Sequence, residues 1–145
     1  MVKLLFVLMN EYRLWALPQA LAALERRYPG AVEGRVYSVR EINADAGLER
    51  ALLADGAAAD MAFLASHGSI QNLYCFSRLW EALEGRPVYF TSTMGDELAE
   101  LLPRLGLEPA LYAALDSYYQ AGSPADLEGL VLCALNGRFG GDYPL

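Results

Sequence analysis

The segment Asp60-Met-Ala-Phe-Leu-Ala-Ser-His-Gly-Ser69 decides the fold of this chain. Its apolar run from Met61 to Ala65 has the length of a strand that is buried on both faces, and a polar turn follows directly. Such an ending is typical of the carboxyl tip of a parallel strand, where ligands bind in open α/β sheets. His67, the single histidine of the chain, lies in this turn.

Strands and helices alternate on both sides of this segment. Apolar residues three or four positions apart from Leu14 to Tyr28 form one helical stripe. Asn43 and Asp45 are candidate N-caps for the helix that follows them. The predicted strands are Lys3–Met9, Val32–Ile42, Met61–Ala65 and Pro87–Thr91, and the predicted helices cover 14–28, 46–55, 76–83, 95–105, 111–120 and 126–135.

This alternation predicts the α/β class, because parallel strands need helical crossovers that cover the sheet. We expect a single flavodoxin- or Rossmann-like open parallel sheet of about four strands, with helices on both faces and a helical C-terminal extension. The length of 145 residues predicts one domain over residues 1–145.

Composition narrows the class of protein. Hydrophobic residues make up 54% of the chain, which is enough for a full core, and the net charge of −7 argues against nucleic acid and anionic membranes as partners. No apolar run approaches the roughly 18 residues of a membrane span. Cys75 and Cys133 form no CxxC pair, so neither a disulfide framework nor a structural zinc site is expected, and the predicted location is cytoplasmic.

Polar residues follow three of the predicted strands. Since the carboxyl ends of parallel strands share one edge of a sheet, these residues should surround one crevice. Their amide, hydroxyl and carboxylate groups, with helix N-termini nearby, suit a ligand that carries carboxylate or phosphate groups. The predicted ligand-binding residues are Asn10, Glu11, Ser66, His67, Gly68, Ser69, Thr91, Ser92 and Thr93.

His67 has two interpretations at this stage. Its imidazole is a candidate metal ligand or general base, but a lone histidine without a second His or Cys nearby makes a poor metal site. The simpler interpretation is that it hydrogen-bonds the turn and orders it. No catalytic residue is assigned, and the chain contains no GxGxxG, GxxxxGK[ST] or GxSxG motif.

Aromatic residues are frequent in the C-terminal half of the chain. Tyr112, Tyr118 and Tyr119, with Trp80 and Tyr74, could line a flat apolar ligand surface, but such residues more often belong to a core or an interface. We therefore favour a core or interface role.

Two C-terminal motifs resemble a known family. Tyr118-Tyr119-Gln-Ala-Gly122-Ser-Pro124-Ala-Asp-Leu127 resembles the pattern YYxxGGxxNLxNLLxFL, and Phe139-Gly-Gly-Asp-Tyr143-Pro resembles the GGDYxxxxP that follows it, in the large subunit of cobaltochelatase and magnesium chelatase (the CobN/BchH family). Upstream, Ala59-Asp60 with Ser66–Ser69 resembles that family's strand and turn, and Pro87–Ser92 its next strand.

The resemblance implies the N-terminal head of such a large subunit, as a fragment or a stand-alone relative. It implies a part in ATP-dependent insertion of Co²⁺ or Mg²⁺ into a tetrapyrrole, with binding or gating of the macrocycle as the head's role. No cofactor of the chain's own is expected. ATP and Mg²⁺ belong on AAA+ partner subunits, and the other partners are the remaining chelatase domains.

Two alternatives stay open. One is a flavodoxin-like interaction or regulatory module without a small ligand, for which self-association into a homo-oligomer is a natural test. The other is a small ATP-independent chelatase that uses His67, since Ser66-His67-Gly68-Ser69 echoes the GHGS-like turn of those enzymes. In those enzymes the turn ends the first strand, whereas here it ends the third.

Overall fold

A four-stranded parallel sheet forms the middle layer of the computed structural model, which describes all 145 residues. The strand order is β2-β1-β3-β4, and all three neighbouring pairs are parallel. This is the order of the leading strands in a flavodoxin-like sheet, so the predicted class is confirmed. The strands are β1 (Val2–Leu8), β2 (Val32–Ser38), β3 (Met61–Ser66) and β4 (Val88–Ser92).

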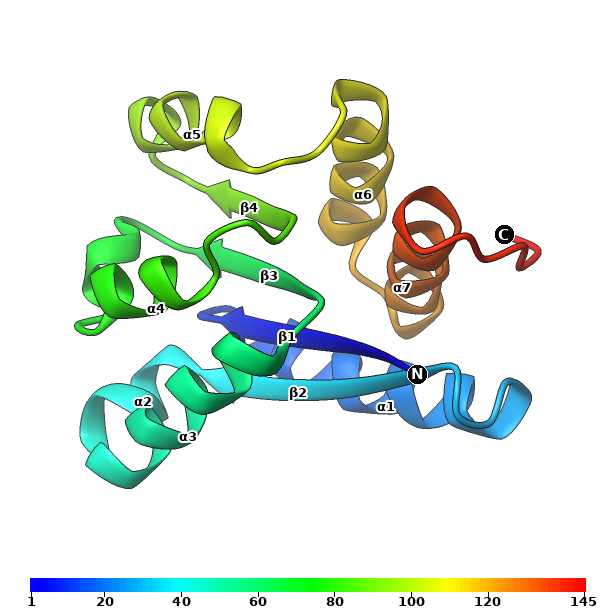
Figure 1. Ribbon diagram of the computed structural model, residues 1–145, viewed down its shortest axis with the longest axis horizontal. Helices are drawn as coiled ribbons and strands as arrows, with labels where there is room; N and C mark the ends of the chain where they lie inside the picture. The colour runs from blue at the N-terminus through cyan, green and yellow to red at the C-terminus, as the bar shows by residue number, and fades with distance from the viewer.

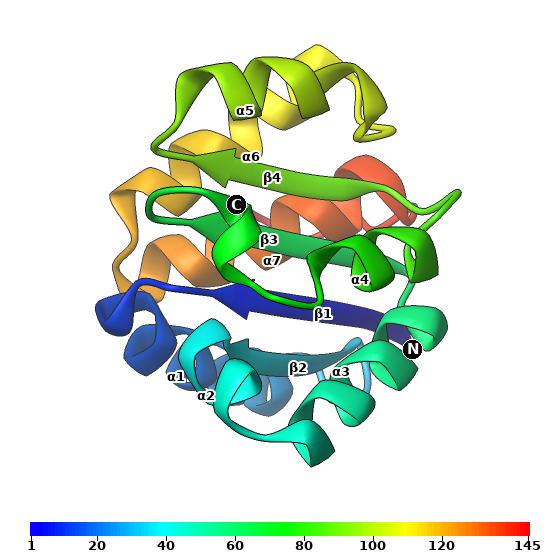
Figure 2. The same cartoon turned by 90° about the vertical axis from the view of Figure 1, so that its left-hand side faces the viewer.

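Helices cover both faces of this sheet, as Figure 1 and Figure 2 show. One face carries α1 (Glu11–Arg27), α6 (Pro109–Ala121) and α7 (Pro124–Arg138). The other carries α2 (Val39–Ala44), α3 (Ala46–Ala58), α4 (Phe76–Ala82) and α5 (Gly95–Leu101). Two short 3₁₀ turns, η1 (Ile70–Asn72) and η2 (Leu102–Arg104), complete the chain.

The two-residue period of the strands divides the core into two layers. In β1, Phe6 faces the layer under α1 and α7, whereas Leu5 and Val7 face the layer under α3 and α4. The Phe6 ring stacks on that of Phe63 in β3, with ring centroids 4.6 Å apart. Buried apolar residues therefore alternate between faces along continuous apolar strands, which is the arrangement that covered parallel sheets require.

The helical C-terminal extension is confirmed, and it completes the layer over one face of the sheet. Helix α7 packs between α1 and α6, and Ser123 begins it with a capping box, in which the Ser123 side chain and the Asp126 side chain each bond the other residue's backbone N–H. Tyr119 is buried in this layer, and Tyr112 and Tyr118 are half-buried there. The core interpretation of these tyrosines is thus correct, whereas Tyr74 is 80% exposed.

The predicted strand Val32–Ile42 is too long, and this expectation is wrong at its C-terminal end. Strand β2 ends at Ser38, and the next residues form α2. Val39 and Ile42 are both buried and lie three positions apart, which is the spacing of one helix face and not of a strand.

The two candidate helix caps, Asn43 and Asp45, have different roles in the structure. Asp45 caps α3 by accepting from the N–H groups of Gly47 and Leu48. Asn43 does not cap this helix. Its amide instead bridges the carbonyl of Asn72 and the N–H of Tyr74, and so holds the loop after η1.

The C-terminal tail has no regular secondary structure, as its glycines predict, but it is held in place. The Asn136 side chain donates to the carbonyl of Tyr143 and accepts from its N–H, both at 2.8 Å. The Tyr143 ring lies 4.8 Å from that of Tyr28 at the end of α1. None of the helices has the length and apolar character to cross a membrane.

Candidate functional site

The predicted crevice exists at the carboxyl edge of the sheet. A pocket of about 290 Å³ opens there between the ends of β1, β3 and β4. It lies where β1 and β3 meet, with crossovers leaving in opposite directions, and ligands bind at such points in open α/β sheets. We call it the carboxyl-edge pocket.

Six of the predicted residues line the carboxyl-edge pocket: Asn10, Ser66, His67, Thr91, Ser92 and Thr93. The prediction that the imidazole and the hydroxyls after β4 share one pocket is therefore confirmed. The other three predicted residues do not line it. Glu11 lies in the groove beside β2. Gly68 and Ser69 belong to the turn after β3 but are not among the residues that line the pocket.

Gly68 holds the turn after β3 in a shape that few other residues adopt. Its φ is +81°, in the left-handed region that favours glycine. Its N–H donates to the Thr93 hydroxyl oxygen at 2.7 Å, and its carbonyl accepts from the Ser66 hydroxyl at 3.0 Å. The turn after β3 is thereby tied to the end of β4.

Glu97, in the first turn of α5, fixes the same turn from the other side. Its carboxylate accepts from the Ser69 hydroxyl and the Ile70 N–H, each at 2.8 Å, and lies 3.0 Å from the Ser92 hydroxyl oxygen. Two serines predicted to meet a ligand thus point at a carboxylate of the chain itself, and Glu97 is a positioning residue of the pocket wall.

Arg13 supplies the cation of the pocket. Its Nε and Nη2 each donate at 2.9 Å to carbonyls in the last turn of α6, those of Tyr119 and Gln120, and its guanidinium lies 4.5 Å above the Tyr119 ring. Unpaired carbonyls at a helix C-terminus carry partial negative charge, so a cation is stabilising there. These two bonds use only part of the five N–H donors of the guanidinium, and Arg13 is one of the residues that line the pocket.

A hydrogen-bond network between α6 and β4 supports the side of the pocket that Thr91 and Gln120 line. The Tyr89 hydroxyl donates to Asp116 at 2.6 Å, and the Gln120 amide reaches both Asp116 at 3.2 Å and the Thr91 hydroxyl at 3.4 Å. Burial, followed by the hydrogen bond to Asp116, holds the pKa of Tyr89 well above its usual value, and burial raises the pKa of Tyr119 to about 12. Both tyrosines therefore stay protonated at neutral pH.

His67 is exposed, and its imidazole makes no hydrogen bond within the chain. Only its backbone is held, because its N–H points at the sulfur of Met9 at 3.3 Å. The interpretation that the imidazole orders the turn is therefore wrong. No group of three or more His, Cys, Asp or Glu side chains that could hold a metal ion exists in the structure, so His67 has no co-ligands for a metal.

Sequence reasoning missed the pocket residues Arg13 and Gln120 and the positioning residue Glu97, and it favoured a core or interface role for Tyr119, which is buried and also lines the pocket. Arg13 had a readable signal, because the first turn of a helix that follows a strand tip faces the same edge as the tip. Gln120 had none, since α6 follows another helical segment and the strand–helix alternation does not place it.

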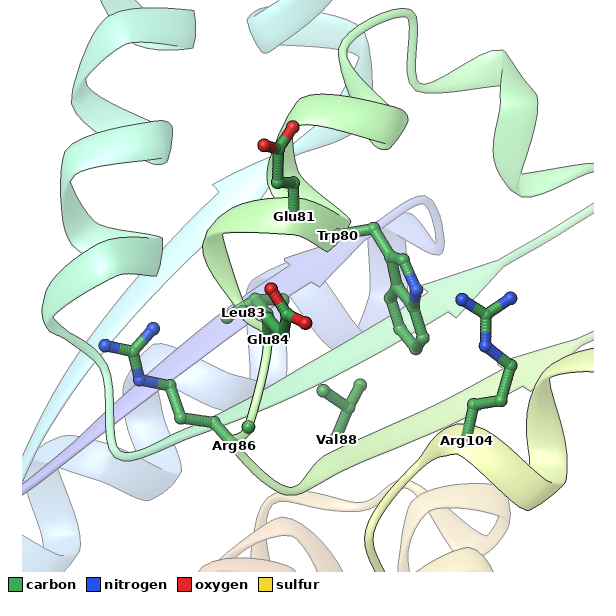
Figure 3. Close-up of a pocket in the computed structure, with 8 residues that line it drawn as sticks. Trp80, Glu81, Leu83, Glu84, Arg86, Val88 and Arg104 are labelled. Carbon is green, nitrogen blue, oxygen red and sulfur yellow. The ribbon is translucent and has the colours of Figure 1, made fainter.

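A second pocket, of about 360 Å³, lies at the opposite, amino end of β4. Figure 3 shows the Arg104 guanidinium beside the Trp80 indole and Arg86 on the far side. Arg86 donates to the carbonyls of Ala57 and Ala82, so it ties together the last turns of α3 and α4. Although this pocket is larger, the carboxyl-edge pocket is the candidate functional site, because ligands of open α/β sheets bind at that edge.

Comparison with known proteins adds no assignment. No model of a protein family matches the chain, and no curated protein matches it.

Proposed function

We propose that the chain is the N-terminal head of a metallochelatase large subunit of the cobaltochelatase and magnesium chelatase kind, or a stand-alone relative of that head. Its role in this proposal is to bind or gate a tetrapyrrole at the carboxyl-edge pocket. Support comes from the two C-terminal motifs. Tyr118–Leu127 spans the end of α6 and the capped start of α7, and Phe139–Pro144 spans the tail that Asn136 holds.

The observation that carries the proposal is the chemistry of the carboxyl-edge pocket. Arg13, His67 and the threonine hydroxyls converge on one opening at the point where β1 and β3 meet. Tetrapyrroles of biosynthesis carry carboxylates on their rim, and guanidinium, imidazole and hydroxyl groups are the usual partners of a carboxylate.

The size of the pocket limits what it holds. Its volume of about 290 Å³ lies just below the range of about 300–1,000 Å³ for pockets that enclose a small molecule. It therefore suits a carboxylate-bearing arm and an edge of the macrocycle, with the remaining surface of the ligand covered by other domains.

The proposal gives the chain a binding role and no chemical step. It assigns insertion of Co²⁺ or Mg²⁺, which are substrates, to the remaining domains in the cytoplasm. ATP and its Mg²⁺ would bind to AAA+ partner subunits, and the chain has no GxxxxGK[ST] loop for a nucleotide.

Titration of the chain with protoporphyrin IX and with hydrogenobyrinic acid diamide tests this function. The Soret absorption of the porphyrin, the near-UV absorption of the corrinoid and the amide NMR signals of pocket residues 10, 13, 65–67, 91–93, 119 and 120 report on binding directly. We expect saturable binding at about 10–100 µM, shifts confined to those signals, and at least tenfold weaker binding of the fully esterified porphyrin.

A variant pair sharpens this experiment. His67→Ala removes an exposed side chain without a hydrogen bond and should weaken binding several-fold at unchanged stability. Gln71→Ala changes an exposed side chain four residues away, outside the pocket, and should change nothing. Absence of binding, or equal binding of acid and ester, would reject the tetrapyrrole role of this pocket.

A further inference from the structure

The free edge of the sheet at β2 is complementary to itself. β2 is the outermost strand in Figure 1 and Figure 2 and pairs only with β1. The Val2 N–H donates to the Ala31 carbonyl, and backbone groups of a strand alternate in direction. The N–H and C=O groups of Val32, Gly34 and Val36 therefore point away from β1, with no strand beyond them.

Opposite charges flank the middle of this edge symmetrically. Glu33 and Arg35 lie on either side of Gly34 and face the same side of the sheet, where the Arg35 guanidinium donates to the Glu33 carboxylate at 2.9 Å; their side chains are 32% and 60% exposed, so each can also meet a charge on a neighbouring strand. If a second β2 lies antiparallel with Gly34 on the two-fold axis, Glu33 of each copy stands opposite Arg35 of the other. Opposite charges directly across an antiparallel pair are stabilising, and here the pair occurs twice.

The same register agrees with the direction of the free backbone groups. Gly34 stands opposite Gly34, and Val32 opposite Val36, so the residues whose N–H and C=O groups point outward face one another. A one-residue shift would put outward groups opposite inward ones and Glu33 opposite Gly34. Backbone direction thus excludes odd shifts, and charge excludes a shift of two residues, which would put Glu33 opposite Glu33 or Arg35 opposite Arg35.

A groove of mixed character adjoins this edge. It has a volume of about 600 Å³, runs between α1, β2 and α2, and is lined by Trp15, Pro18 and Val36 together with charged residues such as Glu11, Arg40 and Glu41. Trp15 is 58% exposed, and its ring lies 5.6 Å from that of Tyr12, which is 51% exposed. Exposed aromatic pairs next to an unpaired strand are typical of an interaction surface.

We propose that two copies of this chain associate through their β2 edges, antiparallel about Gly34, into one continuous eight-stranded sheet. In this register Ser38, at the groove, stands opposite Gly30, so the turn Pro29–Gly30 of one copy meets the groove of the other. A two-fold interface uses the same patch on both copies, as closed homodimers do. The inference is independent of the proposed tetrapyrrole role.

A second copy fits this edge better than an unrelated strand does. An arbitrary strand matches the outward backbone groups, but in antiparallel pairing only a strand with an acidic residue two positions before a basic one, as in Glu33 and Arg35, meets both side chains with opposite charge. Charged residues on an edge also discourage indiscriminate pairing, which leaves the self-complementary register as the favoured one.

Sedimentation equilibrium of the wild-type chain from about 1 to 500 µM is the first test. A dimer of twice the 15.9 kDa chain mass is expected, and it should weaken at high salt because the cross-strand charges are screened. A chain that stays monomeric over this range would overturn the proposal.

Charge reversal then tests the register. Arg35→Glu and Glu33→Arg each turn both attractive pairs into repulsive ones and should raise the dimer Kd about tenfold or more. The double variant Glu33→Arg/Arg35→Glu restores opposite charges across the axis and should recover the wild-type Kd. Arg104→Glu, an exposed reversal near the opposite edge of the sheet, is the matched control.

The outcomes separate the interpretations. Loss of the dimer in both single variants with recovery in the double variant supports pairing about Gly34. A dimer that is unaffected by the single variants, or that fails to recover in the double variant, rejects this interface. Far-UV circular dichroism of each variant verifies that the fold is intact.

Discussion

Replacement of Glu97 by alanine should loosen the wall of the carboxyl-edge pocket and destabilise the whole chain. The Glu97 carboxylate accepts from the Ile70 N–H and the Ser69 hydroxyl and lies within hydrogen-bond distance of the Ser92 hydroxyl. Hydrogen bonds to a charged group contribute about 1.5–3 kcal/mol each, but bonds that share one acceptor do not add.

The magnitude follows from what remains after the substitution. The hydroxyl of Ser92 keeps the Gly68 carbonyl as a partner at 3.2 Å, and the Ser69 hydroxyl can turn to water. The part-buried Ile70 N–H has no other acceptor, and an unsatisfied donor costs about 1–3 kcal/mol. We therefore expect a loss of about 2–3 kcal/mol in the free energy of unfolding, and about 1 kcal/mol for Glu97→Gln, which keeps one acceptor oxygen.

Urea denaturation measures this loss, and amide hydrogen exchange locates it. Exchange at residues 67–71 should speed up more than exchange in the strands. Asp96→Ala is the matched control, because Asp96 is a carboxylate in the same helical turn that is exposed and makes no hydrogen bond. If the free energy of unfolding of Glu97→Ala lies within about 0.5 kcal/mol of the wild-type value, the positioning role assigned to this carboxylate is wrong.

Three further predictions concern the helices that frame the pocket. Because the pKa of Tyr119 is raised to about 12, its contribution to stability is complete below about pH 10 and is lost as the pH rises towards 12, so Tyr119→Phe should flatten that alkaline loss in pH-dependent denaturation. Gly122→Ala should lower the free energy of unfolding by about 2 kcal/mol or more, since φ is +72° and the new methyl group would lie 2.8 Å from the Arg13 guanidinium. Gly85→Ala is the control: its φ is +81° but the space around it is open, so it should cost only about 1 kcal/mol in thermal melts. Ser123→Ala removes the capping box of α7 and should cost about 1 kcal/mol in urea denaturation, and a cost near zero would show that the cap is dispensable.

In the proposed function, ligand binding and stability both involve Arg13. The guanidinium holds the C-terminal turn of α6 and also lines the carboxyl-edge pocket. A ligand carboxylate that binds there meets a cation already oriented by two carbonyls and one aromatic ring. Such preorganisation reduces the entropy that binding would otherwise cost.

The sequence alone determined the sheet and its direction. The apolar runs of strand length at 3–9, 61–65 and 87–91 leave water completely only as strands that are covered on both faces. The helices between them require parallel pairing. From that direction it follows that Asn10, His67 and Thr91 meet at one edge, as the structure confirms. The error over Val39–Ile42 arose because α2, a helix of only 6 residues, is too short for its period to stand out.

Only the tertiary structure decided which polar groups remain available to a ligand. Ser69 is a predicted ligand-binding residue, yet its hydroxyl bonds Glu97 of α5, which lies beyond the next strand, β4; the same carboxylate lies 3.0 Å from the Ser92 hydroxyl oxygen. Arg13 and Tyr119 are 106 positions apart, and their contact depends on how α6 and α7 fold back onto α1. Local periodicity determines where strands and helices form, but packing between distant helices determines which side chains satisfy each other and which face solvent.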